Sequence, residues 1–293
     1  MTAATSKTGR HRPIQPGERS GVLYPENLNR YGAGWFDPDP AVSAVVDQYW
    51  HVHWSLPAGD SIDQRIIDLP AVTVTAEEGN VPAPLVVTGV QSRAWKRRIT
   101  GAGSVFAIRL RPAGLAVLSD LSPQQIADGT LPLTPQLDPR LFRLLSHIAE
   151  AGMPEARARL ADAAISALID ERPPGPERLL ANAILVELSS LIPSRTGASV
   201  AEALGVSERT IQRALRSTLG HGPKWVSRRI RLQEVARALA SDGFDNLAVL
   251  ATDLGYADQA HLTSDFRNVA GITPAAYVRS IRSAPELRTS AAR

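Results

Sequence analysis

The stretch LAVLATDLGYADQAHLTSDF, residues 247–266, has the pattern of two short helices joined by a tight turn. An apolar run fills its first half, and Gly255 follows where the chain must turn with a positive φ. Asp258 is a suitable N-cap for a second helix over residues 258–269. That helix has an apolar side and a polar side, so the whole stretch is typical of a helix-turn-helix unit.

A second stretch of this kind, SVAEALGVSERTIQRAL at residues 199–215, lies about fifty residues earlier. Gly205 again marks the turn, and Ser207 caps a helix expected over residues 208–219. One such pattern could arise from any amphipathic helix with arginines, but two in register are much harder to obtain by chance. Two units in tandem can place two helices in successive major-groove segments of one DNA face.

The polar sides of the two second helices predict how each unit would contact DNA. Arginine and glutamine have the paired donor geometry that base edges require. The expected base-reading residues are Arg209, Gln212, Arg213, Gln259, Ala260, His261, Thr263 and Ser264. The expected phosphate contacts are Ser207, Arg216, Arg228, Arg229, Arg231 and Arg267.

A long helix is expected between the two units. Pro223 at its start and Gly243 after its end bracket about sixteen residues, enough to hold the units about one DNA turn apart. Its arginines, Arg228, Arg229 and Arg231, either meet phosphates or form an ordinary solvated basic face.

Composition agrees with an intracellular DNA-binding chain. The 293 residues include no cysteine, which excludes disulfides, thiolate zinc sites and cysteine nucleophiles and fits a reducing cytoplasm. Residues 177–293 hold 15 Lys and Arg against 11 Asp and Glu, whereas residues 21–176 hold 13 against 17. The basic part is therefore the one with the two units. No apolar run is long enough for a membrane span, and no signal peptide is visible.

The pattern before residue 112 predicts β-structure. Short runs rich in Val, Ile and Trp are separated by turn sequences, as in a small antiparallel barrel or jelly roll. These runs are residues 45–56, 64–68, 72–76, 85–90, 92–100 and 104–111. Helical periodicity follows in residues 115–118, 123–128, 139–151 and 154–170. The amphipathic segment 139–170 either pairs with its copy in a dimer or packs on its own barrel.

The expected organisation is multi-domain. We expect a disordered tail at residues 1–20, a β-barrel-like domain at 21–114 and a helical extension at 115–170. The first tail either only solubilises the chain or reaches DNA as an arm. A Pro-rich linker at residues 171–176 leads to an all-α DNA-binding domain at 177–284 and a tail at 285–293.

Strand alternation in YWHVHW, residues 49–54, puts Trp50, Val52 and Trp54 on one face and the residues between them on the other. A pocket in the barrel would have apolar walls, Trp50 among them, and a few polar groups. Alternatively, the aromatics simply fill the barrel. The candidate pocket residues are Tyr49, His51, His53, Trp54, Arg93, Trp95 and Arg109. Two histidines are too few for a metal site, so we expect no metal. We also expect no cofactor and no catalytic residue.

Residues 180–282 resemble the DNA-binding domain of the AraC/XylS family of bacterial regulators. The resemblance rests on LGYADQAHL (residues 254–262) through Phe266 to GITPAAY (271–277), and on LGVSERTIQR (204–213). It implies that family base contacts fall on the base-reading positions given above. This chain departs from the family at Ser264-Asp265, where a cation is common. More loosely, residues 30–114 resemble the cupin-like N-terminal domain of a subgroup, although that subgroup has a second glycine where Ala113 stands.

These observations predict a cytoplasmic, sequence-specific DNA-binding transcription regulator with no enzymatic activity. The expected partners are double-stranded DNA, a small-molecule effector, a second copy of the chain and RNA polymerase, with no membrane. The alternative is a DNA-binding module whose N-terminal domain is an enzyme or a protein-interaction domain rather than a sensor.

Overall fold

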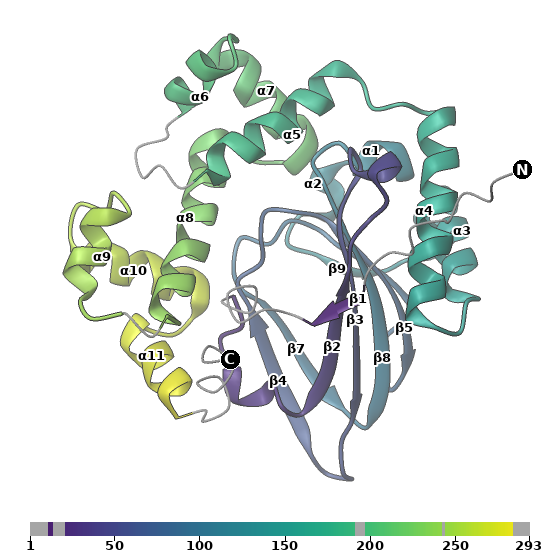
Figure 1. Cartoon of the computed structure of the whole chain (residues 1–293), viewed down its shortest axis with the longest axis horizontal. Coiled ribbons are helices and arrows are strands. Elements are labelled where there is room, and N and C mark those ends of the chain that lie inside the picture. The colour runs from purple at the N-terminus through teal and green to yellow at the C-terminus, as the bar shows by residue number, and fades with distance from the viewer. Residues whose placement is uncertain (1–10, 14–20, 191–196, 242–243, 284–293) are drawn as a thin grey trace, which may run out of the picture.

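The computed structural model describes residues 11–13, 21–190, 197–241 and 244–283. Strands make up the first part of the chain and helices the second (Figure 1). The strands form a barrel-like body, and the helices surround it on three sides. Every strand pair among these described residues is antiparallel.

In the part of the chain that the structure describes, the main sheet has seven strands in the order β1-β2-β3-β8-β5-β6-β9. Its long central strands, β3 and β8, pair over almost their whole length. The strands are β1 (His11–Pro13), β2 (Tyr31–Phe36), β3 (Val46–Ser55), β5 (Thr73–Gly79), β6 (Leu85–Thr88), β8 (Ala102–Leu110) and β9 (Thr130–Pro132).

A second sheet of two strands, β4 (Ser61–Ile66) and β7 (Trp95–Thr100), faces the first. No ladder joins the two sheets within the described residues, so the barrel is open rather than closed. A single bridge between Val22 and Ile66 ties β4 to the segment before β2. The predicted β-rich, barrel-like N-terminal domain is therefore confirmed, in an open form.

Each of the six predicted strand runs contains a strand, with ends shifted by a few residues. The sequence pattern missed β1, β2 and β9. A disordered tail through residue 20 is wrong for residues 11–13, which pair with β2 from His11↔Phe36 to Pro13↔Gly34. The rest of that tail and the tail at residues 285–293 lie outside the described residues.

The helices follow the predicted order, and many begin with proline at the first helical position, where its missing N–H costs nothing. Short 3-10 turns, η2 (Pro25–Asn27) and η3 (Pro40–Val42), precede them. The helices are α1 (Leu115–Leu118), α2 (Pro123–Ile126), α3 (Pro139–Ala149), α4 (Pro154–Glu171), α5 (Pro176–Ser189), α6 (Gly197–Ala203), α7 (Glu208–Leu219), α8 (Pro223–Leu239), α9 (Leu247–Asp253), α10 (Gln259–Ala270) and α11 (Pro274–Arg282).

Helices α3 and α4 pack on the outer face of the main sheet of their own domain. The apolar side of α3, with Leu141, Leu145 and Ile148 fully buried, lies against β5 and β6. On α4, Asp162 accepts a hydrogen bond of 2.9 Å from the buried Tyr49 hydroxyl of β3. Residues 139–170 were expected either to pair with a second copy or to pack on their own barrel. In this structure they pack on their own barrel.

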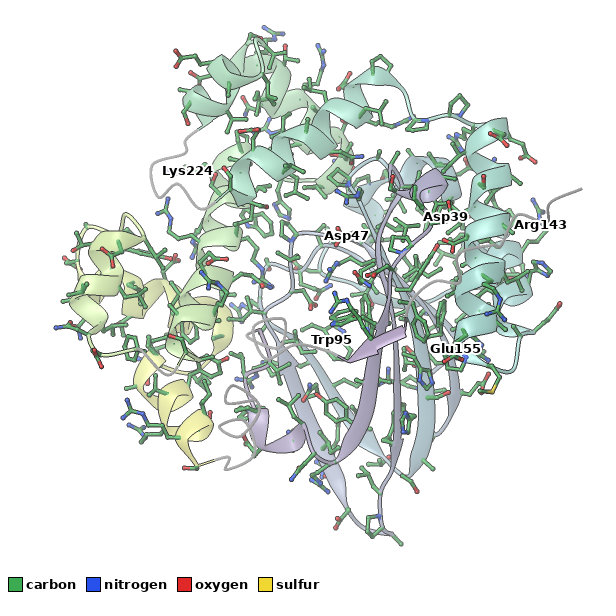
Figure 2. All side chains as sticks on the ribbon, viewed as in Figure 1. Asp39, Asp47, Trp95, Arg143, Glu155 and Lys224 are labelled. Carbon is green, nitrogen blue, oxygen red and sulfur yellow. The ribbon has the colours of Figure 1, made fainter. Side chains whose placement is uncertain are left out.

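The helical C-terminal part lies on the side opposite to α3 and α4. Figure 2 shows this separation: Arg143 and Glu155 lie on the α3–α4 side, and Lys224 lies on α8. Two buried clusters join the parts. One runs from the barrel through α5 and α7 into the first half of α8, and the other unites the second half of α8 with α9–α11 and with Leu23, Ile67 and Ala94. Helix α8 thus belongs to both cores.

Asp138, the N-cap of α3, gives a prediction about pH. Burial opposes ionisation of Asp138, but hydrogen bonds from the Ser119 hydroxyl and from the backbone N–H groups of Leu141 and Asp120 outweigh it and hold its pKa below the usual value. Because the folded pKa lies below the unfolded value of about 3.9, the stabilisation is complete above that pH and is lost as the pH falls through the folded pKa.

We therefore expect Asp138→Asn to lower the free energy of unfolding by about 1–2 kcal/mol at neutral pH. The difference from the unchanged protein should shrink as the pH falls below about 4. Urea unfolding of both proteins across this pH range measures it. A difference that stays constant down to the lowest pH would show that the Asp138 carboxylate does not have a lowered pKa.

None of the helices in the described parts of the chain is long and apolar enough to cross a membrane.

Candidate DNA-binding interface and barrel cavity

Helices α6 and α7 form the first predicted helix-turn-helix unit. Gly205 has φ +63° in the turn, and the Ser207 side chain accepts a hydrogen bond of 3.1 Å from the Thr210 N–H. On the inner side of α7, Ile211 and Leu215 are fully buried. The local pattern of apolar residue, glycine and cap therefore determines the unit as the sequence predicted.

The expected base-reading side of α7 is exposed: Arg209, Gln212 and Arg213 are all on the surface. Nε of Arg213 lies 3.2 Å from Oε1 of Glu177 on α5, an exposed ion pair of little energetic weight. Arg216 is exposed too, and its carbonyl accepts a hydrogen bond from Gln124 of α2. These side chains are therefore accessible to a binding partner outside the protein.

The second unit, α9 and α10, has the same construction. Gly255 has φ +69°, and the Asp258 carboxylate accepts a hydrogen bond of 2.7 Å from the His261 N–H at the start of α10. Leu262 and Phe266 are fully buried beneath the helix. Both predicted units are thus present, one at each end of α8 (Figure 1).

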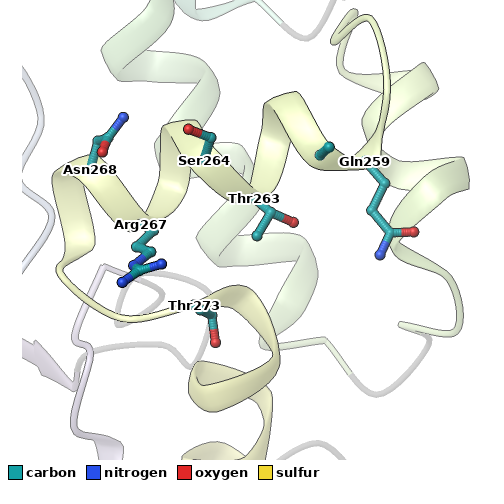
Figure 3. Close-up of a pocket in the computed structure, with 7 residues that line it drawn as sticks. Gln259, Thr263, Ser264, Arg267, Asn268 and Thr273 are labelled. Carbon is teal, nitrogen blue, oxygen red and sulfur yellow. The ribbon is translucent and has the colours of Figure 1, made fainter.

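An open groove runs along the outer side of α10 (Figure 3). It includes four of the five expected base-reading residues of this unit and the expected phosphate contact Arg267. Asn268 and Thr273 also line it and were not predicted. The lining residues are Gln259, Ala260, Thr263, Ser264, Arg267, Asn268 and Thr273. The fifth expected residue, His261, is exposed, and its ring stands edge-on to Tyr256 at 5.3 Å.

Asp265, where the family commonly has a cation, points away from the outer side of α10. It is 6% exposed and accepts hydrogen bonds from Nε of Arg228 at 2.6 Å and from the Tyr256 hydroxyl at 3.1 Å. The bond to Asp265 raises the pKa of Arg228. This carboxylate is therefore part of the core of the second unit. Arg228, expected at phosphate, is exposed and forms an ion pair with it.

Arg229 is not on a DNA-facing surface, and its expected phosphate contact is wrong. Only 2% of it is exposed, and it donates hydrogen bonds to the carbonyls of Asp68, at 2.9 Å, and Arg93. Burial lowers the pKa of Arg229 to about 10. The side of α8 that carries Arg229 packs on the barrel, which a sequence pattern alone does not show. Arg231 is half-buried and lies over the Tyr256 ring.

The second unit also binds the barrel directly, through backbone groups. The Ala94 N–H donates to the Val269 carbonyl at 2.9 Å, and Arg65 donates to the Ala270 carbonyl at 3.1 Å. Gln233 of α8 donates to the Ile67 carbonyl. In this arrangement α8 and the C-terminal end of α10 are docked against the β4–β7 side of the barrel.

A cavity of about 620 Å³ lies inside the barrel, between the main sheet and the β4–β7 sheet. Trp35, Trp50 and Trp54 form part of its wall, from strands β2 and β3. Helix α8 contributes Gln233, Glu234 and Arg237 to the lining of the cavity. The helix that joins the two helix-turn-helix units is therefore also part of the cavity wall.

Three of the seven candidate pocket residues line this cavity: Trp54, Trp95 and Arg109. Tyr49, His51 and His53 do not, and this part of the prediction is wrong. The alternation on β3 is as predicted, but the face with the histidines is the outer one, next to α4. The Arg93 side chain is exposed outside the cavity.

His51 and His53 stack on each other with ring centroids 5.5 Å apart. Burial and the neighbouring His53 lower the pKa of His51 to about 4, so its ring is neutral at neutral pH. Within the described residues, no three histidine, cysteine, aspartate or glutamate residues form a group that could hold a metal.

Comparison with known proteins gives two family matches. A family described as a helix-turn-helix domain matches residues 200–280, and a domain of unknown function (DUF6597) matches residues 35–132. An AraC-like transcription regulator of Streptomyces antibioticus is 34% identical over 84 residues. That match covers 29% of this chain and only 27% of the relative.

Two solved structures match the chain at low similarity. A regulator with an AraC-type DNA-binding domain from Chromobacterium violaceum is 21% identical, covers 34% of this chain and 88% of its own, and has a TM-score of 0.32. ToxT from Vibrio cholerae is 8% identical, covers 80% of this chain and 99% of its own, and has a TM-score of 0.43.

The two capped units, their shared helix α8 and the matched residues define the C-terminal part as a tandem helix-turn-helix domain. Over this domain, the chain is similar to the helix-turn-helix family and to the AraC-like regulator of Streptomyces antibioticus.

Proposed function

We propose that the protein is a sequence-specific DNA-binding transcription regulator that reads two successive major-groove segments with α7 and α10. The observation that carries this proposal is the pair of exposed polar helix faces at opposite ends of α8. Seventeen residues at 1.5 Å each make α8 about 25 Å long, which suits two half-elements about one DNA turn apart. The protein acts in the cytoplasm, and no enzymatic step is part of the proposal.

Base reading and phosphate binding fall on different residues. Arg209, Gln212 and Arg213 of α7, with the groove residues of α10, read base edges. Ser207, Arg216 and Arg267 are exposed beside these faces and meet phosphates, which set the register of the protein on the duplex. Arg229 has no part in DNA contact.

The N-terminal domain acts as the sensor in this proposal. A ligand in the barrel cavity touches Gln233, Glu234 and Arg237, which belong to the helix that sets the relation between the two DNA-reading units. A ligand that binds one position of α8 better than another shifts the population of DNA-binding conformations. Pairing with a second copy and contact with RNA polymerase remain predictions from the sequence.

The test of DNA reading is selection of bound duplexes from a random pool by the full-length protein at physiological salt. We expect a motif with two half-elements about one DNA turn apart. An enriched motif with one short element would contradict the tandem reading. A pool without any enrichment in the absence of ligand would contradict base-specific binding by the ligand-free form.

A substitution at a phosphate contact should act on all DNA sequences alike. We expect Arg267→Ala to weaken binding to the selected site and to random DNA by the same factor and to reduce the salt slope of binding by about 1. Equilibrium binding at several salt concentrations measures this. The control is Arg143→Ala. Arg143 is exposed on α3, far from either unit, so this variant loses the same charge and should leave the salt slope unchanged. A loss confined to the selected site would instead make Arg267 a base-reading residue.

A further inference from the structure

The barrel cavity contains chemistry that narrows the class of its ligand, and this inference rests on the sensor role proposed above. Four of the chain's five tryptophans line it: Trp35, Trp50, Trp54 and Trp95. The fifth, Trp225 on α8, stacks on His221 outside it. Such a concentration of the largest aromatic side chains in one cavity is typical of a surface that holds a flat ring.

These rings do more than fill the core. Trp35, Trp50 and Trp95 remain partly exposed, whereas Phe106, which faces the helices, is completely buried. Trp35 and Trp50 stand edge-to-face at 5.4 Å, and the Arg109 guanidinium lies 5.7 Å from the Trp35 ring centroid. An aromatic ligand would add a further ring to this set and cover the exposed faces.

Five of the seven charged residues that line the cavity already take part in ion pairs. Glu77 meets Arg97 at 2.8 Å, and Glu234 meets Arg237 at 2.6 Å. Arg109 meets Asp47 at 2.6 Å. An anionic or cationic ligand would have to compete with these pairs, and separating Glu77 from Arg97 would leave a buried charge uncompensated.

Two other charged residues of the wall do not change this balance. Lys96 is exposed, and strand alternation places its side chain on the outer face of β7, opposite to Trp95 and Arg97. Burial raises the pKa of Asp68 to about 6, and the neighbouring Arg229 guanidinium opposes this rise. Arg229, which donates a hydrogen bond of 2.9 Å to the Asp68 backbone carbonyl, is the neighbouring cation of the protein itself.

Apart from the ion-paired Glu77 and Arg97, two buried polar atoms of the wall lack hydrogen-bond partners among the described residues. Nε1 of Trp35 is a donor, and Oε1 of Gln64 is an acceptor on a side chain only 6% exposed. Buried polar atoms rarely stay unpaired in folded proteins. A hydroxyl or carbonyl group on the ligand would satisfy them.

We propose that the barrel cavity binds an uncharged, planar aromatic molecule that carries at least one hydroxyl or carbonyl group. The tryptophan rings hold the flat ring system, the paired charges exclude ionic ligands, and Trp35 and Gln64 bind the polar group. At about 620 Å³ the cavity has room for a molecule of several fused rings.

The test compares three probes that share one ring system and differ in charge: pyrenebutanol, pyrenebutanoate and pyrenebutylamine. Binding to the full-length protein is followed through pyrene emission, with dodecanol as a non-aromatic competitor. We expect saturable binding of pyrenebutanol, at least tenfold weaker binding of both charged probes, and no displacement by dodecanol. Equal or tighter binding of either charged probe, displacement by dodecanol, or no binding of pyrenebutanol would overturn the proposal.

Variants locate the site and test its charge rule. Trp50→Leu should weaken pyrenebutanol binding about fivefold, and the matched Trp225→Phe should leave it unchanged. Glu77→Gln frees Arg97 and should strengthen pyrenebutanoate binding several-fold with little effect on pyrenebutanol. Equal effects of the two tryptophan variants, or unchanged pyrenebutanoate binding by a folded Glu77→Gln protein, would overturn it. DNA selection is a separate measurement, so failure of the ligand class and failure of the DNA-binding proposal are distinguishable.

Discussion

Replacing Arg209 and Arg213 together with alanine should lower the affinity for the selected DNA site by about 2–6 kcal/mol. Each arginine that forms a bidentate contact with a base contributes about 1–3 kcal/mol of discrimination. Alanine is the best helix former, so α7 should stay folded. The lost ion pair between Arg213 and Glu177 is exposed and has little weight for stability. Competition binding against random DNA of the same length measures the effect.

The control for this prediction removes two arginines elsewhere. Arg143 and Arg159 are exposed on α3 and α4, far from both helix-turn-helix units, and their alanine variants lose the same charge. We expect the control to leave the preference for the selected site unchanged. Equal losses on selected and random DNA for Arg209→Ala/Arg213→Ala would remove α7 from base reading.

Arg229→Ala should lower the free energy of unfolding by about 2–4 kcal/mol, since hydrogen bonds from a charged group contribute about 1.5–3 kcal/mol each. Without the guanidinium, the Asp68 and Arg93 carbonyls lose their donor at the contact between α8 and the barrel. Removal of the long Arg229 side chain also leaves a gap at this contact. Urea unfolding measures the stability, and DNA binding at several salt concentrations should show an unchanged salt slope.

The matched control is Arg231→Ala on the same helix. Arg231 is half-buried and lies 5.3 Å from the Tyr256 ring centroid, a contact worth about 0.5–1 kcal/mol at a partly exposed site. It should therefore cost less stability than Arg229→Ala. A reduced salt slope for Arg229→Ala without loss of stability would return Arg229 to the DNA surface and contradict its place between α8 and the barrel.

The helix-turn-helix units could be predicted closely because they depend on local signals. Ser207 and Asp258 cap α7 and α10, and Gly205 and Gly255 provide the positive φ of each turn. Helix α8 begins at Pro223, as expected from proline at the first helical position. All of these signals lie within a few residues of the structure that they determine.

The missing strands had weaker local signals. β2, with the sequence YGAGWF, contains two glycines, and a Cβ on Gly32 would meet the ring of His53 as it lies in this structure. β1 and β9 have three residues each, and each contains a proline. Their strand state depends on pairing with distant partners rather than on an alternating pattern.

The faces of β3 and of α8 could not be predicted from periodicity. Alternation separated Trp50 from His51 correctly, but which side faces the cavity depends on where α4 packs. Likewise, Arg229 looks like any exposed arginine until the barrel covers that side of α8. His51 and His53 were predicted to line the pocket because polar groups often bind ligands. The face of β3 that lines the cavity is instead the one with the tryptophans.

The measurement that tests the tandem reading most directly is duplex selection repeated with one variant in each unit. Arg209→Ala/Arg213→Ala changes α7, and Gln259→Ala/Thr263→Ala changes the groove of α10. We predict that each variant loses information in a different half-element of the motif, about one DNA turn apart, and keeps the other half. Loss of the same half by both variants, or an unchanged motif with either, would contradict the account of two recognition helices joined by α8.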